Sequence, residues 1–189
     1  MTDTVSKEAT LYAIRTAKEG GATVSFDPNY RAKLWSSEED AKEAMFCGLK
    51  LADIVKISEE ELFFISGYTS PEQAASYLLE EFGISILVVT KGRNGSVAYT
   101  SSGLRAETYA YDVDTVDTTG AGDAFFGAFI ANFLLCGKKP GSLDKCELEK
   151  ILTIASANGS LSTTKYGAIP AMPTKQQVTD FLKDAKFLT

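Results

Sequence analysis

One short stretch of the chain combines the residue types that handle phosphate groups and protons. It reads Asp-Thr-Thr-Gly-Ala-Gly-Asp over positions 117–123, so Gly120 and Gly122 stand directly before the acid Asp123. Apolar residues then recur at helical spacing over 124–135, which predicts a buried helix that opens at these glycines. The first amides of a helix lack partners within it and lie at the positive end of its dipole, so they attract anions. The sequence therefore predicts a phosphate-binding loop with the Asp123 carboxylate beside it.

The same residues also have a purely structural interpretation. Thr118 or Thr119 would cap the helix, Asp123 would complement the helix dipole, and the glycines would form a tight turn. Two other phosphate motifs are absent from the chain. No Gly-x-x-x-x-Gly-Lys-[Ser/Thr] sequence occurs, which excludes a P-loop enzyme, and no Gly-x-Gly-x-x-Gly follows a strand, which counts against a dinucleotide enzyme.

Composition narrows the chemistry further. The 189 residues include no histidine, which excludes a histidine base, a Ser-His-Asp triad and a histidine-ligated metal within this chain. A general base must then be a carboxylate, lysine, tyrosine or cysteine. The net charge of −6 and the lack of a basic stretch argue against nucleic acid or an anionic membrane as partner.

Cysteine usage and apolar runs predict a cytoplasmic protein. The three cysteines, Cys47, Cys136 and Cys146, are too scattered for a zinc site or a disulfide framework, and they fit a reducing compartment. No signal peptide is recognisable, and the apolar run after Asp123 is too short to cross a membrane.

Alternating helix and strand patterns predict an α/β protein. We expect helices over 6–19, 36–51, 58–66, 70–82, 120–135, 146–161 and 174–186, and strands over 22–26, 53–57, 84–90, 96–100 and 104–111. The second and third of these helices begin with the capping-box patterns Ser36-x-x-Glu39 and Ser58-x-x-Glu61. Strands that alternate with helices indicate βαβ units and a mostly parallel sheet, here within one domain over 1–189. In such sheets ligands bind beyond the carboxyl ends of the strands.

The nine residues Asp-Thr-Thr-Gly-Ala-Gly-Asp-Ala-Phe over 117–125 resemble the C-terminal signature of the PfkB (ribokinase-like) carbohydrate kinase family. The resemblance implies a ribokinase-like three-layer α/β/α fold and phosphoryl transfer from ATP to a sugar hydroxyl. It implies that Asp123 is the general base and that the amides of Gly120, Ala121, Gly122 and Asp123 form the anion hole.

A second segment resembles the fructokinase-like and ketodeoxygluconate-kinase-like members of the family. Asp-Pro-Asn-Tyr-Arg-x-x-Leu-Trp over 27–35 matches their Asp-x-Asn-x-Arg-x-x-Leu-Trp pattern, which implies that Asn29 and Arg31 contact the sugar and the transferred phosphate. Without the resemblance, Arg31 is interpreted as a solvated loop residue. The sugar that the resemblance implies first is a fructose-like ketose, and ketodeoxygluconate or another ketose stays an open alternative.

Further matches concern the metal ions. Residues 56–61 resemble the family segment whose acid organises Mg²⁺ through water, with Ser58 in place of the asparagine, so Glu61 is implied for Mg²⁺. Glu61 is equally the acid of a capping box, and one residue can serve both roles. Residues 163–170 resemble the family's Gly-Ala-x-Pro loop, which implies a K⁺-like ion near Asp117, Thr119 and Gly167; the structural alternative for Asp117 is a turn acid.

The resemblance also implies the residues that bind ATP. Residues 90–95 resemble the nucleotide loop, and positions on the helix expected over 146–161 border the adenine in the family. The implied nucleotide contacts are Ser58, Thr90, Lys91, Gly92, Gly95, Gly122, Ser156 and Asn158. As plain sequence, residues 90–95 are a turn between two strands.

The matches cover the C-terminal part of the family pattern only. The family's N-terminal strands, sugar motif and lid have no counterpart here, and open sheet edges would favour association, including homo-oligomers. Two hypotheses follow: a sugar kinase, or a non-catalytic nucleotide-binding or assembly module derived from the same fold.

Overall fold

The computed structural model describes residues 3–188 and has an α/β fold. The helices are α1 (Thr4–Glu19), α2 (Glu38–Leu49), α3 (Glu59–Ser66), α4 (Pro71–Phe82), α5 (Ala121–Leu135), α6 (Lys145–Ser162) and α7 (Lys175–Asp184). The strands are β1 (Ser25–Phe26), β2 (Ile54–Ser58), β3 (Ile86–Thr90), β4 (Ser96–Thr100) and β5 (Arg105–Thr108), and they follow the order β1-β2-β3-β4-β5 in one sheet. β1 and β2 pair in parallel, with Ser25 opposite Ile54. The expected α/β class is confirmed.

Several expected boundaries need correction. The strand expected over 22–26 is reduced to Ser25–Phe26. The helix expected to open at Ser36 is capped by Ser37, whose hydroxyl accepts from the Asp40 amide, so the Ser36 capping box is wrong. Two adjacent serines each have an acid three residues later, and the sequence pattern does not distinguish between them. The turn expected at 91–95 contains a short 3-10 helix, Gly92–Asn94.

Residue contacts divide the chain into two compact units, Met1–Val89 with Tyr99–Gly103 and Thr90–Ala98 with Leu104–Thr189. The expectation of a single domain over 1–189 stays a prediction. Within residues 3–188, no helix combines the length and apolar character needed to cross a membrane.

The core of the first unit surrounds β2. Ile54, Val55 and Ile57 are all fully buried, as expected for a strand of a parallel sheet covered on both faces. A glycine on α2 allows β1 to approach this core, because a Cβ on Gly48 would lie 2.4 Å from the Phe26 ring. β1 and β2 thus carry the loops that follow them, which contain the residues expected to bind the sugar and Mg²⁺.

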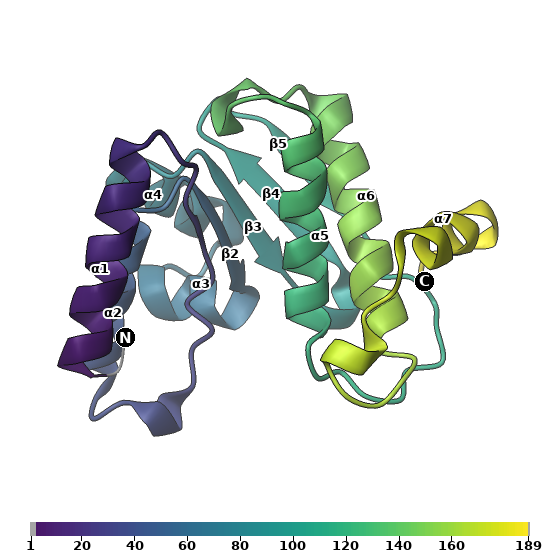
Figure 1. The fold of residues 1–189 in the computed structure, drawn as a ribbon, viewed down its shortest axis with the longest axis horizontal. Helices are drawn as coiled ribbons and strands as arrows, with labels where there is room; N and C mark the ends of the chain where they lie inside the picture. Colours follow the sequence, from purple (N-terminus) through teal and green to yellow (C-terminus); the bar gives the residue numbers. More distant parts are fainter. Residues whose placement is uncertain (1–2, 189) are drawn as a thin grey trace. The chain divides into compact units, whose positions relative to one another are not determined.

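The second unit is built on two long helices, α5 and α6, which lie side by side (Figure 1). α5 buries Phe125, Phe129 and Phe133 at helical spacing. The helices approach closely where α6 has a glycine, because a Cβ on Gly159 would lie 3.3 Å from the Phe125 Cβ. This contact fixes the start of α5, and with it the glycine loop, next to the last turns of α6.

Candidate active site

Gly120 gives the loop before α5 its shape. It is the N-cap residue of α5 with φ of 78°, a left-handed conformation that glycine adopts without steric cost. A Cβ at this position would lie 2.7 Å from the Ala168 Cβ, so the loop around Ala168 packs directly on the Gly120 backbone. Among the described residues 3–188 no side chain caps the helix, and the structural interpretation with Thr118 or Thr119 as the cap is therefore wrong.

The start of α5 presents amide donors. The Ala121 amide donates to the Thr118 carbonyl at 3.1 Å, and the first helical bond runs from Ala124 to Gly120. Within residues 3–188, the amides of Gly120, Gly122 and Asp123 donate to no other group. The Asp123 carboxylate lies in the first turn of α5, is exposed, and has no hydrogen bond or ion pair with a described residue. Amide donors and a carboxylate that have no partner in the described part of the chain therefore lie within one helical turn.

Asp117 joins the glycine loop to the loop that contains Gly167. Its Oδ1 accepts from the Thr119 amide at 2.9 Å and from the Thr119 hydroxyl at 2.7 Å. Its Oδ2 accepts from the Gly167 amide at 2.9 Å. The Gly167 amide, together with the hydroxyl and amide of Thr119, holds the pKa of the Asp117 carboxyl below its ordinary value of 3.8. A carboxylate has about four lone-pair sites, so this one retains capacity for a cation.

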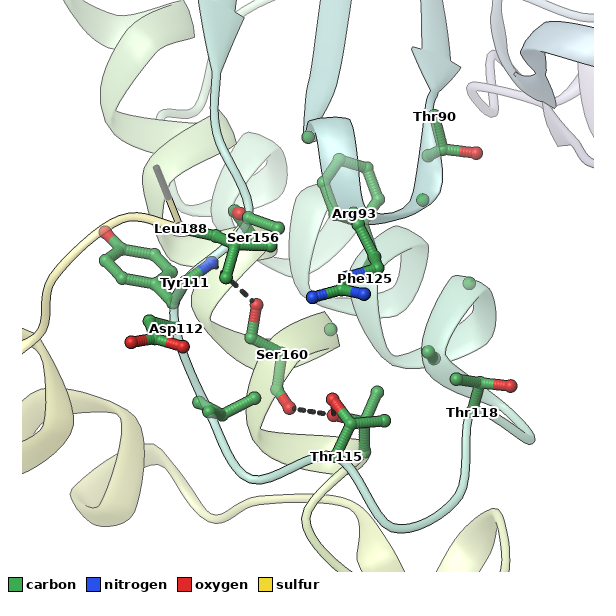
Figure 2. Close-up of a pocket in the computed structure, with 18 of the residues that line it drawn as sticks. Thr90, Arg93, Tyr111, Asp112, Thr115, Thr118, Phe125, Ser156, Ser160 and Leu188 are labelled. Carbon is green, nitrogen blue, oxygen red and sulfur yellow. Dashed lines mark hydrogen bonds between the residues drawn. The ribbon is translucent and has the colours of Figure 1, made fainter.

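A pocket of about 630 Å³ lies within the second unit, in the size range of small-molecule sites. Figure 2 shows it between the loop after β3, the segment 110–115, and the facing ends of α5 and α6. Its lining includes Thr90, Gly92, Arg93 and Gly95; Thr118, Ala121, Gly122 and Phe125; Ser156, Gly159, Ser160 and Thr163; the segment 110–115; and Leu188. The Arg93 guanidinium points towards the middle of the pocket (Figure 2).

The loop after β1 is fixed by a buried ion pair. Lys56 on β2 and Asp27 pair at 2.9 Å, with side chains only 10% and 15% exposed. The other oxygen of Asp27 accepts from the Asn29 amide at 3.0 Å, and Asn29 has φ of 48°, a left-handed conformation that asparagine adopts more readily than most residues. Arg31 is exposed and donates to the carbonyl of Tyr30 at 2.8 Å. The side chains of Asn29 and Arg31 are therefore presented on a constrained turn.

Glu61 holds this loop to α3. Its carboxylate accepts from the Tyr30 amide at 2.6 Å and from the Ser58 amide at 2.7 Å, while Ser58 completes the capping box. The Tyr30 ring also stacks on Phe64 with centroids 4.6 Å apart. Glu61 is 8% exposed. The expected capping box is confirmed, and the free lone pairs of the carboxylate still fit an outer-sphere role towards Mg²⁺.

Comparison with known proteins identifies the family. The model for pfkB family carbohydrate kinases matches residues 1–175. The chain belongs to this family. The resemblance noted over 117–125 is thereby confirmed, and the pfkB match extends from α1 to the first residue of α7.

The relatives of this pfkB chain are sugar kinases by name. Fructokinase-1 of Oryza sativa subsp. japonica is 40% identical over 180 residues, which are 95% of this chain and 54% of that relative. A fructokinase double mutant from Vibrio cholerae O395, solved with fructose, ADP and potassium ion bound, matches 93% of this chain and 55% of its own with 33% identity and a TM-score of 0.83. Aminoimidazole riboside kinase from Salmonella enterica, complexed with aminoimidazole riboside and an ATP analog, matches 97% of this chain and 60% of its own with 34% identity and a TM-score of 0.82.

These matches confirm the ribokinase-like fold. The pfkB chain spans about half the length of the fructokinase relative and little more than half of the two kinase structures.

The structure brings together part of the nucleotide set expected from the family resemblance. Five of the expected contacts line the pocket of the second unit: Thr90, Gly92, Gly95, Gly122 and Ser156. Lys91 does not line it, and its ammonium group pairs with Glu107 at 2.8 Å. Asn158 does not line it either, and its amide donates to the Ile154 carbonyl at 2.8 Å. Ser58 belongs to the other unit, together with Asn29, Arg31 and Glu61.

The expected set omitted several pocket residues. The sequence contained a signal for Arg93 as a nucleotide contact, because this cation lies inside the segment that resembles the nucleotide loop. Thr118 lies inside the signature itself. The sequence contained no such signal for the segment 110–115 or for Leu188, because residues on irregular backbone follow no periodic pattern that can be recognised.

Proposed function

We propose that this pfkB-family chain binds ATP and transfers its γ-phosphoryl group to a hydroxyl of a fructose-like ketose. The start of α5 carries this proposal, because amides of Gly120, Gly122 and Asp123 and the Asp123 carboxylate have no partners among residues 3–188. Amides with free N–H groups can donate hydrogen bonds to a phosphoryl group, and a carboxylate with free oxygens can accept a proton from a hydroxyl group. Membership in a carbohydrate kinase family and the fructokinase relatives support this proposal.

ATP is assigned to the pocket of the second unit. Gly92, Gly95 and Gly122 allow the backbone to approach phosphates closely, and Arg93 supplies a cation for them. The apolar Phe125 ring and the segment 110–115 also line the pocket, and we assign this part to the base and ribose. The ADP-bound fructokinase and the kinase solved with an ATP analog support this assignment.

Phosphoryl transfer then demands mainly positioning and charge stabilisation. The sugar hydroxyl oxygen forms a bond to the γ-phosphorus while the bond from that phosphorus to the bridging oxygen of ADP breaks. Asp123 takes the hydroxyl proton late in this step, when the attacking oxygen has become acidic enough for a carboxylate to accept it. The amides at the start of α5 stabilise the negative charge on the moving phosphoryl group.

The remaining site residues serve binding. Asn29 and Arg31 are assigned to the sugar, and the guanidinium group suits anionic oxygens. Mg²⁺, when bound, neutralises phosphate charge, and Glu61 is assigned to it through water. K⁺, when bound, stabilises the loops joined by Asp117, with Thr119 and Gly167 as further contacts. The potassium ion in the related fructokinase supports that assignment.

The first test compares Asp123 with a carboxylate at the same helical position elsewhere. Asp123 and Asp40 are each the third residue of their helices, α5 and α2. Asp123→Asn should lower turnover of ATP with fructose by about 10²–10⁴-fold with little change in the dissociation constant of ATP. Asp40→Asn should leave both values nearly unchanged.

Calorimetric titration of ATP with magnesium and potassium present, followed by an assay for ADP with fructose, separates the alternatives. ATP binding with turnover supports the kinase. ATP binding without turnover of any ketose supports the non-catalytic nucleotide-binding module. Full activity of Asp123→Asn would overturn the assignment of the base.

A further inference from the structure

The segment 186–188 returns from α7 to the nucleotide pocket. The Asp112 amide donates to the Lys186 carbonyl at 2.9 Å, and the Leu188 amide donates to the Ala110 carbonyl at 2.7 Å. These bonds form an antiparallel bridge between Tyr111 and Phe187. The segment 110–112 lines the pocket. Its backbone is therefore held in place by a segment that follows about 75 residues later in the chain.

Aromatic packing anchors this bridge. The Phe187 ring stacks on Tyr111 with centroids 4.6 Å apart and meets the edge of Tyr109 at 6.0 Å. Tyr111 also meets Phe181 of α7 at 5.2 Å. Tyr111 is only 6% exposed, and this burial raises the pKa of its phenol. Phe187 remains 43% exposed, and its ring contacts are those with Tyr111 and Tyr109.

Leu188 itself lines the pocket. It lies at the same end as Ser156 and Tyr111, away from Thr118 at the start of α5 (Figure 2). The Ser156 hydroxyl donates to the Tyr109 carbonyl, and the Tyr111 amide donates to the Ser160 hydroxyl, so α6 holds the segment 109–111 from a second direction. Leu188 therefore adds an apolar side chain where the segment 110–112 is fixed by both α6 and segment 186–188.

We propose that segment 186–188 forms a wall of the nucleotide pocket, with Leu188 as an apolar contact for the base and Phe187 as the anchor that keeps this wall in place. This inference rests on the proposed function, because it takes the ligand of the pocket to be an adenine nucleotide. The family match ends at residue 175, so segment 186–188 lies outside the part that the family model covers. The planar face of the purine is the most apolar part of a nucleotide, so its removal from water by an apolar side chain contributes favourably to the binding free energy.

The test measures dissociation constants of ATP and AMP by calorimetry on the whole chain. Leu188→Ala should raise both constants by a similar factor of about three- to tenfold, because the lost contact is to the base that both ligands share. Phe187→Ala should raise both dissociation constants at least as much, because loss of the Phe187 ring removes the contact with Tyr111 and releases segment 186–188, including Leu188, from the pocket. Arg93→Ala should raise the constant for ATP more than that for AMP, since it acts on phosphates.

Two control variants separate this role from general effects. Lys186→Ala keeps the main-chain bond from Asp112, and Leu135→Ala removes a leucine that is 79% exposed on α5. Both should change the dissociation constants by less than about twofold. Thermal unfolding of every variant shows whether the fold persists, and Leu188→Ala keeps the test decisive if Phe187→Ala unfolds.

The outcomes are distinct for the two proposals. Absence of ATP binding by the unaltered chain would overturn the proposed function and this inference together. Normal ATP binding that persists unchanged in Leu188→Ala and Phe187→Ala would overturn the role of segment 186–188 alone. A loss confined to ATP, with AMP unaffected, would also overturn it, because the contact would then act on phosphates.

Discussion

At the scale of single residues, hydrogen bonds constrain the protonation of Asp117. Three donors from Thr119 and Gly167 stabilise its charged form and hold its pKa below 3.8. An unfolded chain provides no such donors, so the folded state binds this proton less readily. Asp117 therefore stabilises the folded state above pH 3.8, and this stabilisation is lost as the pH falls through the lower folded-state pKa.

Asp117→Asn should accordingly unfold more readily than the unaltered chain at pH 7, with the difference shrinking below pH 3.8. Urea unfolding of the variant and of the unaltered chain, at pH 7 and at about pH 2 to 3, measures this difference in stability. Asp184→Asn is the control, because Asp184 is exposed and no donor to it is found among residues 3–188. A difference between the Asp117 variant and the unaltered chain that persists at pH 2 to 3 would contradict a charge-based role.

Glu61 shows what sequence can and cannot predict at this scale. The capping box with Ser58 is local, with the two residues three positions apart, and the sequence predicted it correctly. The bond from the Tyr30 amide to Glu61 joins residues 31 positions apart, and no local pattern encodes it. Asp27 and Lys56 pair across a similar separation and were equally unpredictable as partners. The site roles of Asn29, Arg31 and Glu61 stay predictions.

At the scale of elements, Gly120 at the N-cap of α5 and Gly127 inside α5 have opposite expected responses to substitution. Gly120 has φ of 78° and would place a Cβ 2.7 Å from the Ala168 Cβ. Gly127 lies inside the helix with no atom within 4 Å of an added Cβ. Gly120→Ala should lower the free energy of unfolding by about 1–3 kcal/mol, because it adds backbone strain and a contact that must shift. Gly127→Ala should raise it by about 0.5–1 kcal/mol, because alanine favours a helix.

Denaturant unfolding of the two variants in parallel measures both effects. Each variant adds one methyl group, at the N-cap of α5 or inside this helix, so each is the control for the other. Equal effects of the two substitutions on the free energy of unfolding would contradict a special role for the Gly120 conformation. Gly120→Ala should also weaken ATP binding, whereas Gly127→Ala should not.

Element types were predictable here, and element boundaries were less so. The apolar run of β3 and the glycine stops of α3 and α4 are local signals, and the structure has these elements. β1 is shorter than expected because only Ser25 and Phe26 pair with β2 in parallel. Ser37 caps α2 in place of Ser36. The sequence pattern did not distinguish between these two adjacent serines.

At the scale of the whole molecule, the residues expected to act together belong to different compact units. Asp123, Asp117 and the pocket lie in the second unit, and Asn29, Arg31 and Glu61 lie in the first. A sequence motif identifies residue types along a chain without reporting which unit they join. The family signature thus predicted the glycine loop, and it gave no indication of this division or of the contribution of Leu188.

Hydrogen exchange with and without ATP provides a whole-molecule prediction. A ligand that binds only the folded second unit, at a concentration of about 100 times its dissociation constant, adds about 2.7 kcal/mol to the opening free energy of that unit. Amides that exchange only through opening of that unit should then exchange about 100-fold more slowly. We expect this effect in 90–95, 110–122 and 156–163, which line or border the pocket.

The amides of residues 54–57 in β2 of the first unit provide the internal control, since ATP is assigned to none of these residues. Ser58, the last residue of β2, is an expected nucleotide contact and does not belong to this control. Adding fructose should slow exchange in 27–35, because Asn29 and Arg31 are assigned to the sugar. Slowing by ATP that is centred on 27–35 and absent from 110–122 would contradict the assignment of ATP to the pocket. Slowing of equal size throughout residues 3–188 would instead show that the two units open as one, because ligand binding in the second unit would then stabilise the first to the same extent.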